Sequence, residues 1–322
     1  MIRFFTNTYN HTFIGLLVLS IAFGITGIFN PYVNTTAPLA VNYLQQFFNT
    51  INHYHILGVF INTLMITITA VVFNNICNKH ELTILPSYLP AYFFIIFNCI
   101  FIDQYYAGPV IFVNYFVILS LGAILNLFDS ESPYFSLFLA SFLAGISTLL
   151  NISYIAFFAI VLIGINIFRP FNIRENISAF IGFAMPLYIG TMVNYLINDN
   201  FLPYQIFFPD YGNYQKFQWV FNSALPAIAI IAVLGFIRMY QNFYRNSVKQ
   251  KRAIQLMILI SIACIILVFT GKQNSKQEFS FLAIPLSYFF SFYFTNSKTN
   301  YFKEFLNILL LVIIVFFLFN SI

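Results

Sequence analysis

The chain has 322 residues, of which 60% are hydrophobic and 7% charged, and its mean hydropathy is +0.84. A soluble domain carries about 25% charged residues, so a chain this apolar cannot cover itself with polar surface. The net charge of +5 comes from dispersed Lys and Arg side chains, which excludes a nucleic-acid-binding protein. The composition therefore predicts an integral membrane protein.

Cofactor chemistry finds little support in the sequence. The three cysteines, Cys77, Cys99 and Cys264, are far apart, and no CxxC or Cys/His spacing is present. This arrangement predicts neither a disulfide framework nor a metal site, and core thiols are the expected role. No P-loop, GxSxG, HExxH or Rossmann fingerprint occurs either. We predict no cofactor, which leaves a divalent metal ion as the one group still open.

Apolar runs long enough to cross a bilayer recur along the chain. A spanning helix needs about 17 to 25 apolar residues, and eleven runs approach or reach that length. They predict an all-α, polytopic transmembrane helix bundle in a single integral membrane domain, residues 1–322. The runs are 12–29, 54–73, 85–102, 107–128, 134–150, 152–168, 177–197, 221–237, 253–270, 279–294 and 305–319.

The distribution of basic residues predicts the orientation. With a cytoplasmic amino terminus, the outer loops hold only Lys216, Lys272 and Lys276, and the inner loops hold the other eleven of the fourteen Lys and Arg residues. This is the asymmetry of the positive-inside rule. The runs 134–150 and 152–168 are separated only by Asn151, and we interpret them as a hairpin because one merged span would reverse this asymmetry. The 44 Phe against one Trp indicate an AT-rich coding sequence, as in a low-GC bacterium. The expected location is the bacterial inner (cytoplasmic) membrane.

The first outer loop, residues 30–53, contains no Lys, Arg, Asp or Glu. Within it, one helical face collects apolar residues and the opposite face collects Asn and Gln. This spacing predicts an amphipathic helix near residues 39–52 that lies in the membrane interface. The apolar face consists of Leu44, Phe47, Phe48 and Ile51.

Candidate functional residues map to the outer face, because the predicted spans contain no Asp, Glu, Lys or Arg near their middles. That absence disfavours an ion-coupled transporter. Lys272 and Lys276 are four apart, so on a helix they would share a face that could hold a phosphate. A pair of ordinary interfacial lysines is the alternative. The other outer candidates are Glu278, His53, His55, Asp103, Asp199 and Asp210; the two histidines are poorly spaced for a metal.

Two segments carry a resemblance. Residues 139–151, continuing through Arg169-Pro170-Phe171-Asn172 to Met185-Pro186, and residues 276–285 together resemble an uncharacterised family of inner-membrane proteins from Bacteroidota. More distantly, they look like multi-spanning glycosyltransferases of the GT-C type. In such enzymes a late basic residue contacts the phosphate of a polyprenyl-linked donor. The resemblance implies this role for Lys276, together with Lys272.

The chain departs from the GT-C pattern in its first outer loop, where such enzymes carry acidic residues. Either Asp103 or another outer acid would have to substitute as catalytic base, or the protein is a non-catalytic relative, so enzyme activity stays open. The sequence thus predicts a protein that handles a lipid-linked or phosphate-bearing glycan or lipid at the periplasmic face. A membrane scaffold or subunit of an envelope complex is the alternative, followed by a transporter. The expected partners are membrane lipids, including a polyprenyl-phosphate-linked substrate.

Overall fold

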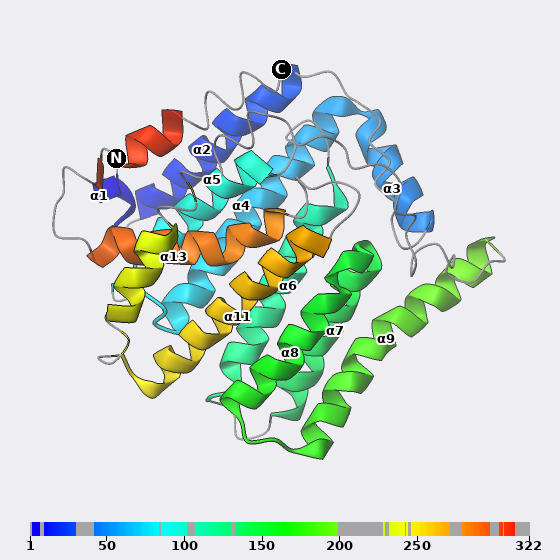
Figure 1. Cartoon of the computed structure of the whole chain (residues 1–322). Coiled ribbons are helices and arrows are strands. Elements are labelled where there is room, and N and C mark those ends of the chain that lie inside the picture. The colour runs from blue at the N-terminus through cyan, green and yellow to red at the C-terminus, as the bar shows by residue number, and fades with distance from the viewer. Residues whose placement is uncertain are drawn as a thin grey trace.

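The computed structural model describes residues 2–6, 10–29, 42–83, 85–101, 107–129, 133–198, 228, 232–241, 243, 246–270, 279–296, 303–304 and 306–312. Every regular element in these ranges is a helix (Figure 1), which confirms the predicted all-α class for them. The main elements are α1 (Ile2–Phe5), α2 (Asn10–Phe29), α3 (Asn42–His53), α4 (His55–Lys79), α5 (Leu89–Phe101), α6 (Pro109–Asn126), α7 (Tyr134–Leu150), η1 (Ile152–Tyr154), α8 (Ile155–Phe168), α9 (Ile173–Asn198), α11 (Val248–Thr270), η4 (Phe279–Leu282) and α13 (Ala283–Asn296).

Within the described residues, four helices, α2, α4, α6 and α9, are long and apolar enough to cross a membrane. Four further apolar helices, α5, α7, α8 and α13, have 13 to 17 residues, which is shorter than a typical span. The hairpin predicted at Asn151 is present as α7, η1 and α8. The chain is thus a helical membrane protein, and the count of eleven spans stays a prediction.

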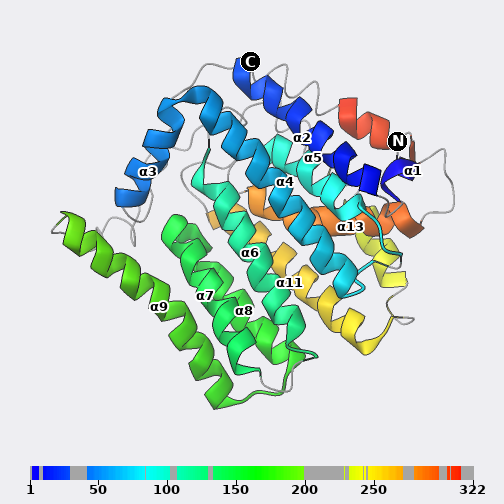
Figure 2. The ribbon, with the colours of Figure 1, turned by 180° about the vertical axis from the view of Figure 1, so that it is seen from behind.

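The described helices form two layers. One layer runs in the order α2, α4, α6, α7 and α9, each helix in contact with the next (Figure 2). The other layer contains α13, α11 and α8 (Figure 1). Helix α5 packs between α13 and α4, and all its side chains from Ala91 to Ile100 are buried. A helix that is apolar on every side must be surrounded in this way.

Aromatic rings fill the centre of the bundle. The Phe93 ring lies 5.5 Å from that of Phe290 and 5.0 Å from that of Phe294, and the Phe97 ring lies 4.8 Å from Phe290 in an edge-to-face arrangement. Such pairs contribute about 0.5 to 1.5 kcal/mol each beyond simple burial.

Helix α5 begins at Leu89, four residues later than the predicted run 85–102. The segment before it, which contains Pro86, is not helical.

Glycines bring α7 and α9 into close contact. A methyl group built on Gly182 would lie 2.7 Å from the Phe138 carbonyl oxygen, and one built on Gly145 would lie 2.7 Å from the Phe183 carbonyl oxygen. Membrane helices associate closely through such small residues, because lipid offers no hydrophobic driving force between them. The small-residue segment 139–151, noted for its resemblance to other families, therefore has a packing role here.

The carboxyl end of α4 is closed by a Schellman motif. The N–H of Leu82 donates to the carbonyl of Cys77 (2.9 Å), and the N–H of Glu81 donates to that of Asn78 (3.3 Å). Glu81 has φ 52°, in the left-handed region where glycine is usual. A carboxylate is also unfavourable at the negative end of the helix dipole. Glu81 is therefore a costly residue for this position.

Replacing Gly182 by leucine should separate α7 from α9. The added side chain would meet the Phe138 backbone, and overpacking of this kind costs about 1 to 3 kcal/mol. The expected result is a lower midpoint of thermal unfolding in detergent. Ile181→Leu is the matched control, because Ile181 is exposed and its substitution should leave the midpoint unchanged. Equal midpoints for Gly182→Leu and the wild type would contradict the close contact.

Glu81→Gly should stabilise the protein by about 0.5 to 1 kcal/mol. The free energy of unfolding rises because glycine adopts the left-handed conformation without strain. The larger conformational entropy of glycine in the unfolded chain offsets part of this gain. Glu81→Ala is the control, since it removes the carboxylate but keeps a Cβ. Thermal unfolding in detergent should rank Gly above Ala, and the reverse order would show that backbone conformation is not the cause.

Candidate functional site

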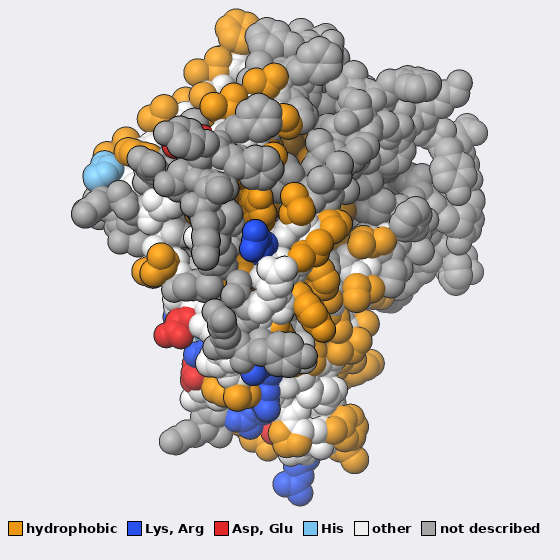
Figure 3. Space-filling model, turned by 60° about the vertical axis from the view of Figure 1, so that its left-hand side comes forward, with side chains coloured by type: hydrophobic (Ala, Val, Ile, Leu, Met, Phe, Trp, Pro, Cys, Tyr) orange, Lys and Arg blue, Asp and Glu red, His pale blue; other side chains and the backbone are white. Residues whose placement is uncertain are grey.

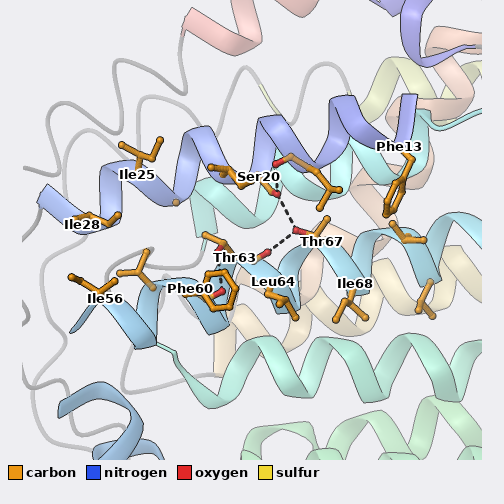
Figure 4. Close-up of a pocket in the computed structure, with 16 residues that line it drawn as sticks. Phe13, Ser20, Ile25, Ile28, Ile56, Phe60, Thr63, Leu64, Thr67 and Ile68 are labelled. Atoms are coloured by element: carbon orange, nitrogen blue, oxygen red, sulfur yellow. Dashed lines mark hydrogen bonds between the residues drawn. The ribbon is translucent and has the colours of Figure 1, made fainter. Parts of the chain in front are cut away.

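An apolar groove of about 600 Å³ lies between α2 and α4 (Figure 4). Almost all of its lining is aliphatic or aromatic side chain, and the polar exceptions are three hydroxyls. It is open along one side, between two helices that are each suited to cross a membrane. The lining residues are Phe13, Leu17, Ser20, Ile21, Gly24, Ile25, Ile28, Ile56, Val59, Phe60, Thr63, Leu64, Thr67, Ile68, Val71 and Val72.

The floor of the groove is the place where α2 crosses α4. Gly24 lies against the Thr63 side chain, where any larger residue would overlap it. Close by, the Thr67 hydroxyl lies 2.9 Å from Ser20 Oγ and 2.7 Å from the Thr63 carbonyl oxygen (Figure 4). The hydroxyls of Ser20 and Thr63 donate to carbonyls within their own helices, Leu17 and Phe60. The hydroxyls therefore join the helices, and the open wall of the groove suits a hydrocarbon chain.

One end of the groove lies at the start of α4, next to the predicted histidines in the sequence. Ile56, in the first turn of α4, lines the groove directly after His55. The His55 side chain is half-buried, and neither ring nitrogen has a hydrogen-bond partner among the described residues. His53 ends α3, is exposed, and packs edge-to-face on Tyr54 with ring centroids 5.2 Å apart. The two histidines thus belong to different helices. The described residues contain no group of three His, Cys, Asp or Glu side chains placed to hold a metal ion.

Helix α3 occupies most of the segment predicted as amphipathic. Phe48 is buried, with its ring 5.4 Å from that of Phe112, whereas Phe47 of the same predicted face is exposed. The helix is fixed by Asn52, whose amide donates to the Ala107 carbonyl (3.1 Å) and accepts from the Ala107 N–H (2.8 Å). Gly58 leaves space for this amide, since a methyl there would lie 2.6 Å from Asn52 Oδ1. No pattern in the sequence predicts this link to the segment just before α6.

The predicted outer lysines lie outside the described residues. So do Glu278, Asp103, Asp199 and Asp210, and all these assignments stay predictions. The structure describes the flanks of the lysine segment, which are the end of α11 at Thr270 and the start of η4. The Phe281 ring in η4 lies 5.3 Å from that of Tyr154. The chain therefore leaves this segment beside the turn between α7 and α8.

A second polar region, which sequence reasoning did not single out, lies at the opposite end of α4. Most of the Lys and Arg side chains on the face shown in Figure 3 gather toward one end of the molecule. Lys79 donates to Asn126 Oδ1 (2.9 Å), Lys249 pairs with Asp129, and Arg252 donates to the Phe168 carbonyl (2.6 Å). Loops predicted to share the cytoplasmic side thus meet here. Their cations bind free carbonyl groups at the carboxyl ends of helices, where the helix dipole favours positive charge.

His80 lies within this polar region, immediately after α4. Burial, followed by the positive charges of Lys249 and Lys79, lowers its pKa to about 4, against the opposing effect of Asp129. His80 Nδ1 has no hydrogen-bond partner among the described residues. The imidazole is therefore neutral in the folded protein at neutral pH.

The long apolar helices and the lateral groove define a helical membrane protein. Within that class, the chain belongs to a family of unknown function, DUF6427, whose model matches residues 32–322. Membership agrees with the predicted resemblance to an uncharacterised family. Comparison with curated proteins and with solved structures finds no match. The Bacteroidota origin and the GT-C likeness stay predictions.

Stability should fall as the pH is lowered from about 6.5 to about 4. Because the pKa of His80 is lower in the folded protein than in the unfolded chain, the unfolded chain takes up the proton first. The contribution of His80 to the free energy of unfolding is complete above its unfolded pKa of about 6.5 and is lost once the pH falls to its folded pKa of about 4. Thermal unfolding midpoints across this range, compared with those of His80→Gln, measure it. The variant should show a shallower slope, and identical slopes would contradict the assignment.

Proposed function

We propose that the protein binds a phosphate-bearing lipid, or a lipid-linked glycan, at the periplasmic face of a bacterial inner membrane. The groove between α2 and α4 would hold the hydrocarbon chain. The groove is the observation that carries this proposal, because its size lies in the range of about 300 to 1,000 Å³ that is usual for ligand sites. Its apolar wall offers nothing to a polar ligand.

Selectivity has to come from the head group. A chain that moves from bilayer to groove exchanges one hydrocarbon environment for another, so the hydrophobic effect contributes little and only packing favours the groove. Polar contacts at the end of the groove must then distinguish the bound lipid from its neighbours. His55 lies at that end, and Lys272 and Lys276 are the cations predicted for the same side of the membrane. A lysine ammonium is a suitable point charge for a phosphate.

The distant likeness to GT-C enzymes narrows the proposed ligand to a polyprenyl-phosphate-linked donor. In that case the long isoprenoid chain would occupy the groove, and Lys276 would contact its phosphate. Asp103 would be the acid available as base for glycosyl transfer. Binding and catalysis are separable here, and the groove supports the binding step.

The second candidate is a membrane scaffold, and the exposed face of α9 favours it. Phe180, Tyr188 and Leu196 project from this helix with most of their surface uncovered. A partner's transmembrane helix could pack there. Photo-crosslinking from position 188 in intact membranes distinguishes the two: a discrete protein adduct supports the scaffold, and lipid adducts alone oppose it.

Filling the groove should displace the bound lipid. Ile25→Trp combined with Leu64→Trp places two large rings on exposed groove-lining positions, so folding should be preserved. We expect the phosphate-bearing lipid that co-purifies in mild detergent, measured by mass spectrometry, to fall about tenfold, which corresponds to about 1.4 kcal/mol of lost binding. Ile181→Trp, on the exposed face of α9, is the control and should change nothing.

The head-group part is tested separately with Lys272→Ala and Lys276→Ala together. This variant should retain chain occupancy of the groove but lose selectivity for phosphate-bearing lipids in the same assay. If the groove variant and the lysine variant both carry the wild-type lipid complement while remaining folded, the proposal is wrong.

A further inference from the structure

A hollow of about 540 Å³ lies at the turn between α8 and α9, at the charged end of the bundle. This end is the far end of α4 from His55, and it is not part of the proposed groove. One short segment lines the hollow and supplies groups of both charges. The lining residues are Arg169, Pro170, Phe171, Asn172, Ile173, Arg174 and Glu175.

The negative charge in the hollow is Glu175, in the first turn of α9. Its side chain is almost fully buried, with 7% of the residue exposed. Oε1 lies 3.5 Å from Arg169 Nη1, whereas Oε2 accepts no hydrogen bond from the described residues. Arg169 Nε is directed to the Leu127 carbonyl (3.4 Å). A buried carboxylate oxygen without a donor is costly, so this oxygen indicates a missing donor group.

The positive charge comes from Arg174 and from the helix itself. The Arg174 side chain is exposed, and its backbone N–H donates to Asn172 Oδ1 (3.1 Å), which caps the start of α9. The amino end of a helix carries a partial positive charge that favours anions such as phosphate. The hollow thus offers an anion site and a buried carboxylate within one turn of chain.

The rim of the hollow is apolar and continues into the membrane-spanning face of α9. Phe171 is 71% exposed, and Ile173 and Ile177 are exposed beside it. Helix α9 is a candidate span from Ile173 onward, so the hollow lies at the level where the hydrocarbon ends. A ligand here would carry hydrocarbon chains as well as charges.

From these features we infer that the hollow binds the head group of a phospholipid with a phosphate and a primary ammonium, as in phosphatidylethanolamine. The phosphate lies against Arg174 and the amino end of α9. The ammonium pairs with the Glu175 carboxylate; Oε2 is closed off from the hollow in this structure and accepts an ammonium N–H once the side chain turns toward it. The acyl chains follow Phe171, Ile173 and the exposed face of α9. The occupant is a bilayer lipid, and the inference is independent of any ligand in the α2–α4 groove.

Head-group chemistry provides a sharp test. Choline lipids keep the phosphate and the positive charge but have no N–H donor, and glycerol lipids keep the phosphate without any ammonium. Native mass spectrometry of the purified protein with matched acyl chains should show phosphatidylethanolamine bound about tenfold more tightly than phosphatidylcholine or phosphatidylglycerol. Tenfold is the expected size of one charged hydrogen bond.

Two variants assign the contacts. Glu175→Gln keeps the shape of the side chain and should abolish the preference for ethanolamine over choline. Arg174→Gln should weaken the binding of all three lipids. Lys251→Gln is the control, because Lys251 lies at the same end of the bundle over the Phe243 ring and outside the hollow.

Equal binding of ethanolamine and choline lipids by the wild type would overturn the inference. So would a preference for the glycerol lipid, which would indicate an anion site without a role for Glu175. Because the comparison uses one folded protein with three lipids, it does not depend on the stability of any variant. The groove variant with Ile25→Trp and Leu64→Trp should retain the ethanolamine preference, which separates this site from the proposed function.

Discussion

The absence of water from the hydrocarbon region is the constraint on which the rest of this structure depends. Backbone groups there must find partners within the protein, and helices provide them. Polar side chains inside the bundle follow the same rule. The hydroxyls of Thr69, Ser147 and Thr148 each donate to the carbonyl four residues earlier in their own helix. Among the described residues, full charges lie toward helix ends, where they satisfy carbonyls such as that of Phe168. The uncharged interior and the charged end are consequences of one solvent property.

Two kinds of helix contact follow from this constraint. Aromatic rings fill the space between α5 and α13, and glycines allow close approach at the α7–α9 and α2–α4 crossings. Helices α2 and α4 are in close contact at Gly24, which lies at the floor of the groove. Beside this contact the two helices leave a lateral opening. The groove is therefore a consequence of the close packing at this crossing. It becomes a binding site only where a polar group can recognise a lipid head group.

Much of the helical content could be predicted from the apolar runs, because membrane helices need long uninterrupted hydrophobic segments. Helix ends were harder, as the start of α5 at Leu89 shows. The groove could not be predicted, since its lining resembles any lipid-facing surface. Small and hydroxyl residues at spacing four, Ser20 with Gly24 and Thr63 with Thr67, were the available signal. The pairing of Arg169 with Glu175 and of Asn52 with Ala107 depends on backbone positions that spacing alone does not specify.

The two hydrogen bonds between Asn52 and Ala107 link α3 to the segment that leads directly into α6. An amphipathic helix at a membrane surface takes its depth from the density of the surrounding head groups. If α3 lies in the interface as predicted, a change in lipid packing would shift it, and the Asn52 amide would carry the displacement to Ala107, two residues before α6. That helix contacts α4, α7 and α8. The predicted surface helix is in this way coupled through Ala107 and α6 to the centre of the bundle.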